Sequence, residues 1–252
     1  MTKAALSVKG LVKRFGGLTA TDGLDLEVRP GEIHAVIGPN GAGKTTLINQ
    51  LSGELRHDAG TILLHGVDVG NESVQSRSRM GIARSYQITS VFQEFTALQN
   101  VMLAVQGASG RSFAFWQPVS RDRTLIEPAQ GLLQLVGLGD QARTPVAAMA
   151  HGARRQLELA MTLALKPKVM LLDEPMAGMS HQESEAMTGL LQKLKGQYAI
   201  VLIEHDMDAV FALADRITVV VYGRPIACGT AEQIKNDPEV RLAYLGEQEE
   251  AI

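Results

Sequence analysis

The chain has 252 residues, of which 45% are hydrophobic, so it is long enough to bury a full core as one domain with subdomains. Its formal net charge of −3 provides no general attraction to nucleic acid, and we expect no nucleic-acid partner. No stretch approaches the roughly 18 consecutive apolar residues of a spanning helix, and no long apolar region follows the N-terminus. We therefore expect a soluble chain in the cytoplasm, with membrane association only through partners.

Strand patterns dominate the first part of the chain. Leu6 and Val8, and then Leu24, Leu26 and Val28, alternate with other residues as in half-exposed antiparallel strands. Arg29-Pro30-Gly31-Glu32 reads as a turn into the apolar run Ile33–Ile37, and Thr61–Leu64 continues the β-rich region.

The segment after Ile37 predicts a nucleotide-binding site. It reads Gly38-Pro39-Asn40-Gly41-Ala42-Gly43-Lys44-Thr45-Thr46 and matches the phosphate-loop pattern G-x-x-x-x-G-K-[ST]. Glycines allow backbone N–H groups to turn toward phosphates, Lys44 places a charge on the β- and γ-phosphates, and the Thr45 hydroxyl can ligate Mg²⁺. A helix from Thr45 onward would add its positive N-terminal end. The alternative is an incidental glycine-rich turn, but the strand, loop and helix signals agree.

Two further strands end in polar residues. Val169-Met170-Leu171-Leu172 has the composition of a buried parallel strand and leads into Asp173-Glu174-Pro175. Next to a phosphate loop, Asp173 is expected to hold Mg²⁺ through water and Glu174 to polarise an attacking water. The alternative is an acidic surface turn.

The run Tyr198–Ile203 leads into Glu204-His205-Asp206, which places His205 at another carboxyl edge of the sheet. A histidine at this position can donate a hydrogen bond to the γ-phosphate. Taken alone, a histidine after an apolar strand is more often a capping or partly buried structural residue.

Helical spacing replaces the strand pattern after Gln87. Apolar residues recur at Val101, Val105, Leu125, Leu132, Leu133, Leu135 and Val136. Gly107–Arg123, which contains Trp116, reads as a long loop or hairpin between helices, and the α/β pattern resumes from Gly152. The only cysteine, Cys228, excludes an intrachain disulfide and suits a reducing cytosol; we expect it to be a small buried apolar residue.

The order of these motifs resembles ATP-binding cassette (ABC) transporter ATPases from about residue 6 to the C-terminus. The resemblance rests on the phosphate loop, Gln87, Met149–Gln156, Val169–Pro175 and His205. Within that family, Gly81–Arg84, Ile203–Met207 and Asn236–Glu247 resemble the ATPase subunits of high-affinity branched-chain amino-acid importers.

This resemblance implies a fold and a set of site residues. The fold is a single α/β domain: a P-loop NTPase (RecA-like) core with an antiparallel β subdomain (residues 1–90 and 151–252) and an inserted α-helical subdomain (91–150). Phe15 corresponds to the aromatic residue that stacks on adenine, the alternative being a core side chain beside Val12 and Leu18. Gln87 corresponds to the residue that touches Mg²⁺ and the attacking water. Glu174, His205 and Gln87 are then catalytic, and Thr45, Gln87 and Asp173 hold the metal.

Two segments depart from the family pattern at the surface that faces a second ATPase subunit. The usual signature Leu-Ser-Gly-Gly-Gln is Met149-Ala150-His151-Gly152-Ala153, and the usual Ser-Ala-Leu-Asp is Ala177-Gly178-Met179-Ser180. Ala150 has no hydroxyl to offer a γ-phosphate, although Gly152 and the helix amides remain. We therefore expect a second, different ATPase subunit more than a homodimer.

The resemblance predicts an ATP- and Mg²⁺-dependent ATPase that drives uptake of branched-chain or related amino acids. Its partners would be transmembrane permease subunits and, indirectly, a solute-binding protein outside the membrane. An importer for urea or amides, a non-transport ABC ATPase, and a regulatory subunit with little turnover remain alternatives. The transported solute is not encoded in this chain, because permease and binding protein determine it.

Overall fold

The computed structural model describes residues 3–85, 91–109 and 122–249, with side chains as far as residue 243. The strands of the described part are β1 (Leu6–Phe15), β2 (Leu18–Val28), β3 (Ile33–Ile37), β4 (Ala59–Leu64), β5 (Val67–Asp68), β6 (Ile82–Ser85), β7 (Val169–Asp173), β8 (Ala199–Ile203), β9 (Arg216–Val221) and β10 (Arg224–Gly229). The α-helices are α1 (Lys44–Ser52), α2 (Val74–Met80), α3 (Ala97–Ala108), α4 (Arg123–Leu135), α5 (His151–Ala164), α6 (His181–Leu194), α7 (Met207–Leu213), α8 (Ala231–Asn236) and α9 (Pro238–Glu249).

A six-stranded sheet in the order β10-β9-β3-β8-β7-β6 forms the centre of the molecule. The pairs from β9 to β6 are parallel, and β10 is an antiparallel edge strand. Every residue of β3, β7 and β8 is buried, as expected for parallel strands covered on both faces. The strand predictions for 33–37, 169–172 and 198–203 are confirmed. The prediction that Cys228 is a buried apolar residue is wrong, because it lies on the edge strand β10 and is exposed.

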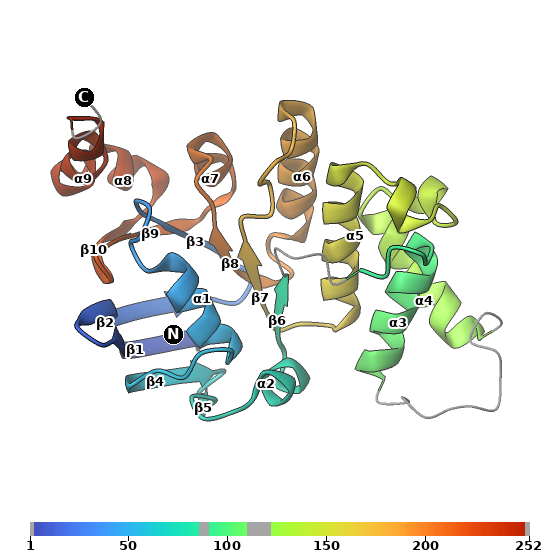
Figure 1. Cartoon of the computed structure of the whole chain (residues 1–252), viewed down its shortest axis with the longest axis horizontal. Helices are drawn as coiled ribbons and strands as arrows, with labels where there is room; N and C mark the ends of the chain where they lie inside the picture. Colours follow the sequence, from blue (N-terminus) through green and yellow to red (C-terminus); the bar gives the residue numbers. More distant parts are fainter. Residues whose placement is uncertain (1–2, 86–90, 110–121, 250–252) are drawn as a thin grey trace.

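The second sheet is antiparallel, in the order β2-β1-β4-β5. Its inward residues Leu6, Val8, Leu24, Leu26 and Val28 pack with α1 against one face of the parallel sheet. Figure 1 shows α1 between the two sheets. Alternate residues of β7 divide the core, because Val169 and Leu171 face this layer whereas Met170 and Leu172 face the helices on the other side.

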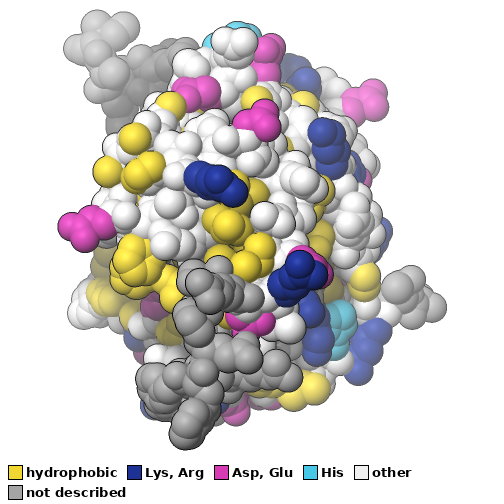
Figure 2. All heavy atoms as spheres, turned by 90° about the vertical axis from the view of Figure 1, so that its right-hand side faces the viewer, with side chains coloured by type: hydrophobic (Ala, Val, Ile, Leu, Met, Phe, Trp, Pro, Cys, Tyr) yellow, Lys and Arg dark blue, Asp and Glu magenta, His cyan; other side chains and the backbone are white. Residues whose placement is uncertain are grey.

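Helices α3 and α4 pack beside α5 at one end of the molecule (Figure 1). Figure 2 looks onto this end and shows hydrophobic side chains between scattered charged ones. The predicted loop at 107–123 is too long, because α3 continues to Ala108 and α4 begins at Arg123. Asp122 caps α4 by accepting a hydrogen bond from the Thr124 amide at 2.9 Å. Trp116 lies outside the described residues.

None of the helices in the described ranges combines the length and the hydropathy needed to cross a membrane.

A buried arginine joins α1 to α2. The Arg77 guanidinium donates to the carbonyls of Gln50 at 2.6 Å, Leu51 at 2.8 Å and Gly70 at 2.9 Å. The first two carbonyls belong to the last turn of α1, where no intrahelical donor is available. A Cβ at Gly53, which ends α1, would lie 2.9 Å from Arg77 Nε, so this glycine permits the close approach. Arg77 therefore stabilises the C-terminal end of the helix that follows the phosphate loop.

We predict that Arg77→Met lowers the free energy of unfolding by roughly 2 to 5 kcal/mol, because the substitution leaves buried carbonyls without donors. Urea unfolding followed by circular dichroism measures this change. Arg79→Met on the same helix is the control, since Arg79 is exposed, and its effect is expected within about 0.5 kcal/mol. Equal effects of the two substitutions would contradict the stabilising role of Arg77.

Candidate active site

The predicted site residues gather at the carboxyl edge of the parallel sheet. Gly38 follows β3, Glu174 follows β7, and His205 lies two residues after β8. The parallel register pairs Val36 with Ile203 and Asp173 with Ile203, so the three strands end at the same level. Gln87 follows β6 in the sequence and lies outside the described residues.

The phosphate loop ends in an open helix N-terminus. Gly43 is the N-cap of α1 in the left-handed conformation (φ 100°), and no side chain caps the helix. The first amides of a helix have no intrahelical partner, so this end is suited to an anion. Lys44 Nζ donates to the carbonyls of Gly38 at 2.5 Å and Pro39 at 2.9 Å. The loop residues therefore fit a phosphate group, with α1 beginning one residue earlier than predicted.

Two loop glycines are required by close packing. A Cβ at Gly38 would lie 2.0 Å from the carbonyl oxygen of Val220, and a Cβ at Gly43 2.1 Å from that of Ala20. Real Cβ contacts are never this short, so any other residue would displace the loop from β9 or β2. The loop is held between the two sheets by backbone contacts.

Asp173 forms a buried ion pair with Arg84. Arg84 Nη2 lies 3.0 Å from Asp173 Oδ2, and Arg84 Nη1 lies 2.7 Å from Glu54 Oε2 and 2.6 Å from Asn49 Oδ1. Burial raises the pKa of the Asp173 carboxyl, and the charge of Arg84 opposes this shift. The arginine therefore favours the ionised carboxylate that a metal ion requires.

Among the described residues, no three His, Cys, Asp or Glu side chains are placed to hold a metal ion. The predicted ligands Thr45 and Asp173 supply a hydroxyl and a carboxylate, which are oxygen donors suited to Mg²⁺. This donor set fits an ion that takes its remaining ligands from phosphates and water.

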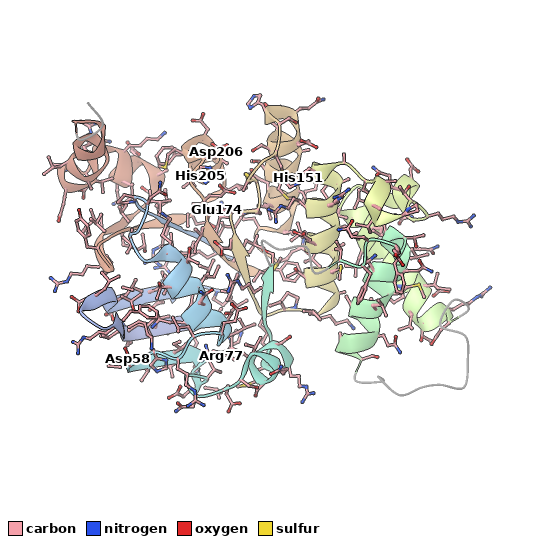
Figure 3. The ribbon with its side chains drawn as sticks, viewed as in Figure 1. Asp58, Arg77, His151, Glu174, His205 and Asp206 are labelled. Carbon is pink, nitrogen blue, oxygen red and sulfur yellow. The ribbon has the colours of Figure 1, made fainter. Side chains whose placement is uncertain are left out.

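Glu174 and His205 lie next to each other (Figure 3), with His205 Nδ1 3.9 Å from Glu174 Oε1. The Glu174 amide donates to the Ile203 carbonyl at 2.8 Å, and its backbone has a φ of 47°. A non-glycine residue in this region carries local strain, which is found most often at functional sites. The hydrogen bond to β8 fixes the backbone from which this carboxylate extends.

Glu204 contacts both the loop that follows β7 and the loop that follows β8. Its carboxylate is buried and accepts hydrogen bonds from the amides of Met176 at 2.9 Å and His205 at 3.1 Å. Burial raises the pKa of the Glu204 carboxyl, which these two amides oppose. Glu204 thereby connects the Glu174 loop to the His205 loop.

Phe15 is 49% exposed and its neighbour Leu18 is 66% exposed, so the alternative assignment of Phe15 to the core is wrong. The two residues are paired at the hairpin end of β1 and β2. Ala20, two residues further along β2, contacts Gly43 of the phosphate loop. An exposed ring thus lies on the strand pair that adjoins the loop.

The signature segment begins α5 and is held by α6. Ala150 is the N-cap of α5 and offers no side-chain hydrogen bond. The Gly152 amide donates to Glu183 Oε1 at 3.1 Å, and His151 Nε2 lies 3.1 Å from the Ala177 carbonyl oxygen. Figure 3 shows His151 at the end of its helix, apart from Glu174 and His205. The signature is therefore presented separately from this chain's own nucleotide loop.

The structure adds Arg84, Glu183 and Glu204 to the residues that shape this region. In the sequence, Arg84 and Glu204 stand within longer family-like segments, and no motif singles out Glu183. The capping box of Ser180 and Glu183 has the S-x-x-E pattern, which was the available signal for the helix start. No local pattern indicates that Glu183 also reaches Gly152.

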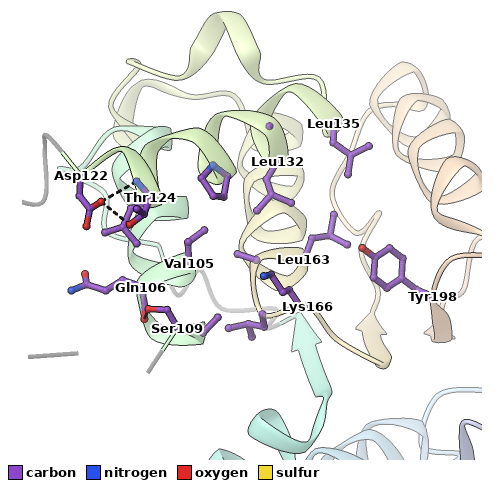
Figure 4. Close-up of a pocket in the computed structure, with 16 residues that line it drawn as sticks. Val105, Gln106, Ser109, Asp122, Thr124, Leu132, Leu135, Leu163, Lys166 and Tyr198 are labelled. Carbon is purple, nitrogen blue, oxygen red and sulfur yellow. Dashed lines mark hydrogen bonds between the residues drawn. The ribbon is translucent and has the colours of Figure 1, made fainter. Parts of the chain in front are cut away.

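A cavity of about 1120 Å³ lies away from this site, between α3, α4 and the end of α5. Figure 4 shows Val105, Leu132 and Leu163 along its walls, with Tyr198 at one side. The described residues that line it include the charged pair Asp122 and Lys166, but they do not bring together the several charged groups that phosphate or metal chemistry requires. The sheet edge, which does gather such groups, is therefore the candidate site, and this cavity is not.

Comparison with known proteins agrees with this geometry. Residues 21–177 match the family model described as ABC transporter, and residues 224–250 match the one described as branched-chain amino acid ATP-binding cassette transporter. The high-affinity branched-chain amino acid transport ATP-binding protein LivG of Escherichia coli is 39% identical, over 98% of this chain and 100% of that protein. BraF of Pseudomonas aeruginosa, which is described in the same words, is 37% identical over 98% of this chain and 100% of that protein.

A solved ATP-binding cassette of an ABC transporter, in its ADP conformation, has the same fold. The TM-score is 0.85 at 27% sequence identity, and the match covers 96% of this chain and 99% of that one. The chain therefore belongs to the ABC transporter family of ATP-binding proteins. The predicted α/β P-loop NTPase fold and the predicted ABC-type ATPase are confirmed, and family membership implies membrane permease partners.

We predict that Arg84→Gln raises the pKa of Asp173 further, because burial then acts without the opposing positive charge. The substitution should therefore destabilise the protein most at neutral pH, and least well below the unfolded aspartate pKa of about 3.9, where Asp173 is protonated in both folded and unfolded states. An NMR titration of the Asp173 carboxyl carbon measures the shift.

Glu54→Gln is the matched control for this titration. Glu54 raises the pKa of Asp173, so its removal should not shift the titration upward. An unchanged Asp173 pKa in Arg84→Gln would show that the ion pair does not control this carboxyl.

Proposed function

We propose that this chain is the ATP-hydrolysing subunit of an importer for branched-chain amino acids, with residues of the sheet edge as its catalytic machinery. The observation that carries the proposal is the convergence of an open phosphate loop, Asp173, Glu174 and His205 at one edge. The names of LivG and BraF support the solute class, and favour it over urea or amides. A non-transport ABC ATPase has no comparable support among these relatives.

In this proposal, residues Gly38–Thr46 hold ATP. The amides of the loop and of the first turn of α1 donate hydrogen bonds to the phosphate oxygens. When ATP binds, Lys44 gives up its hydrogen bonds to the carbonyls of the loop and contacts the β- and γ-phosphates instead. Phe15 stacks on the adenine ring. Thr45, Gln87 and Asp173 hold Mg²⁺, which when bound neutralises charge on the β- and γ-phosphates.

Glu174 orients and polarises the water that attacks the γ-phosphorus. The bond between that phosphorus and the β–γ bridging oxygen breaks, and ADP leaves with the bridging oxygen. His205 donates a hydrogen bond to a γ-phosphate oxygen, and its side chain is exposed enough to reach an incoming nucleotide. Gln87 would contact the same water and help to hold Mg²⁺. Glu204 acts through backbone amides by fixing the loops that carry Glu174 and His205.

Membership of the ABC transporter family supports permease subunits as partners. We propose a location on the cytoplasmic face of the cell membrane, bound to permease subunits through residues around Gln87 and the helical region 91–150. A solute-binding protein acts on the other side of the permease. The remaining residues, 1–90 and 151–252, form the nucleotide-binding core.

We propose that the second ATPase subunit is a different chain. In an ABC dimer the signature of one subunit faces the nucleotide loop of the other, and here Ala150 supplies no hydroxyl. The Gly152 amide is engaged by Glu183, so a partner's phosphate must compete with a carboxylate for it. In a homodimer, both nucleotide sites would lack the signature hydroxyl, and both would face a Gly152 amide that already donates to Glu183.

We predict that Glu174→Gln lowers ATP turnover of the assembled transporter by a factor on the order of 10² or more, with nucleotide binding nearly unchanged. Lys44→Ala should instead weaken ATP binding, because the phosphates lose a fixed counter-charge. Steady-state hydrolysis and fluorescent-nucleotide titration separate the two effects.

Glu185→Gln is the control for these variants, since Glu185 is an exposed carboxylate on α6 and should retain wild-type turnover. Wild-type turnover in Glu174→Gln would remove Glu174 from the mechanism. Wild-type ATP affinity in Lys44→Ala would refute the assignment of the phosphate loop.

We predict slow hydrolysis by this chain alone and faster hydrolysis when a second, different ATPase subunit is added. A signature hydroxyl hydrogen-bonded to a phosphate contributes about 1 to 3 kcal/mol, so Ala150→Ser should raise the activity of the isolated chain. ATPase assays across protein concentration test this. Fast, cooperative turnover by the unmodified homodimer would contradict the heterodimer, and slow turnover in the complete transporter would favour a regulatory subunit.

A further inference from the structure

The end of β1 carries Phe15 on an irregular stretch of strand. The pairing of β1 with β2 shifts in register between Leu11 and Lys13 and again between Lys13 and Arg14. Such shifts mark β-bulges, which bend a strand and change the direction of the side chains beyond them. The orientation of the Phe15 ring therefore depends on what holds this stretch in place.

Asp58, which lies beside the antiparallel sheet (Figure 3), holds both sides of this irregularity. Its carboxylate accepts a hydrogen bond from the Arg14 amide at 2.7 Å, and its own amide donates to the Val12 carbonyl at 2.8 Å. The other carboxylate oxygen accepts a hydrogen bond from Lys13 Nζ at 2.9 Å. The hydrogen bonds from Lys13 and from the Arg14 amide lower the pKa of the Asp58 carboxyl. One residue thus fixes three consecutive positions of the strand.

Lys13 connects this carboxylate to the aromatic ring. Its Nζ lies over one face of the Phe15 ring, 5.6 Å from the ring centroid. The lysine side chain is only 14% exposed, so it is packed in place instead of moving freely like a surface lysine. Attraction between the cation and the ring favours this arrangement. Because Lys13 takes one face of the ring, a base can stack only on the opposite face.

A second lysine–aspartate pair on the same sheet is looser and lies farther from the ring. Lys9 Nζ is 3.7 Å from Asp25 Oδ2, and the two side chains are 61% and 58% exposed. Asp25 also accepts a hydrogen bond from a β1 amide, that of Gly10, at 2.6 Å. Lys9 precedes Phe15 by six residues, which is roughly 20 Å along a strand. This pair has the same chemistry as Lys13 and Asp58 without the contact to the ring.

We propose that Lys13 and Asp58 are positioning residues for the base of the nucleotide, which hold the Phe15 ring in the orientation that stacks on adenine. This inference rests on the proposed function, in which Phe15 receives the adenine ring and Gly38–Thr46 hold the phosphates. An exposed aromatic side chain without such neighbours samples several rotamers and loses this freedom when a ligand binds. The lysine and its aspartate restrict the ring before the nucleotide arrives, so less ordering accompanies binding.

The effect of this pair is confined to the base end of the nucleotide. Lys13 lies on β1 and Asp58 directly before β4, whereas the phosphates bind at the N-terminus of α1. Loss of the pair should therefore weaken the binding of ATP and leave the binding of inorganic triphosphate, which has no base, unchanged. The ratio of the two affinities isolates the contribution of the ring.

The test measures the binding of ATP and of inorganic triphosphate to the purified chain by isothermal titration calorimetry, with Mg²⁺ present. Lys13→Met should lower the ratio of ATP affinity to triphosphate affinity roughly two- to tenfold, the effect of leaving one side chain to be immobilised on binding. Lys13→Arg keeps a cation for both the carboxylate and the ring, so it should retain most of the wild-type ratio. An unchanged ratio in Lys13→Met would overturn the proposal.

Asp58→Asn removes the charge that holds the lysine and should lower the ratio as Lys13→Met does. The looser pair supplies the matched controls Lys9→Met and Asp25→Asn, whose ratios should equal that of the wild type. Equal losses in Lys9→Met and Lys13→Met would show a general loosening of the sheet and contradict the positioning role. If circular dichroism shows that Asp58→Asn is unfolded, Lys13→Met decides the proposal.

Phe15→Ala separates this inference from the proposed function. A wild-type ratio in Phe15→Ala would show that the ring does not stack on the base, and the role of Phe15 in the proposed function would then be wrong as well. A lowered ratio in Phe15→Ala together with a wild-type ratio in Lys13→Met would refute the positioning role alone. In the double variant, loss of Lys13 should have no further effect, because the lysine acts through the ring. A further, additive loss would contradict this.

Discussion

Parallel pairing of β3, β8 and β7 is the constraint on which the candidate site depends. The three strands are buried on both faces, so a one-residue slip would turn every side chain to the opposite layer of the core. The register is therefore fixed by packing and brings Gly38, Glu174 and His205 to one edge. The hydrogen bond from the Glu174 amide to Ile203 extends this pairing beyond β7. This hydrogen bond helps to keep the Glu174 backbone at its positive φ of 47°, which is unfavourable for a non-glycine residue.

Charged groups at this edge are buried together with the groups that compensate them. Asp173 has Arg84, and Glu204 has the amides of Met176 and His205. An unpaired carboxylate in such a position would protonate or unfold the loop. The polar contacts thus preserve the charge of these groups, while the apolar strands beneath them position the backbone.

The start and the end of β3 lie in different surroundings because of the position of this strand in the sheet. The strand lies in the middle of the sheet, so side chains at its start meet β9, while its end leads into the phosphate loop. His34 is buried at the first end, where Glu32 and Thr218 satisfy both ring nitrogens. At the end of β3, Gly38 has no Cβ and therefore leaves room for the Val220 carbonyl of β9. A buried histidine in a central strand is tolerated here because every polar atom of its ring has a partner.

The sequence by itself determined the local elements of the protein. The phosphate-loop pattern, the buried strand before Asp173 and the alternation at Leu24–Val28 each depend on residues close together in the chain, and the structure contains the loop, strand and antiparallel sheet they predict. The tertiary structure decided which distant groups meet: Arg84 with Asp173, 89 positions apart, Gly152 with Glu183, and Arg216 with Cys228. It also decided that Phe15 and Cys228 are exposed. No periodicity encodes these outcomes, because they follow from strand order and from which strand lies at the edge, and both are set by packing of the whole chain.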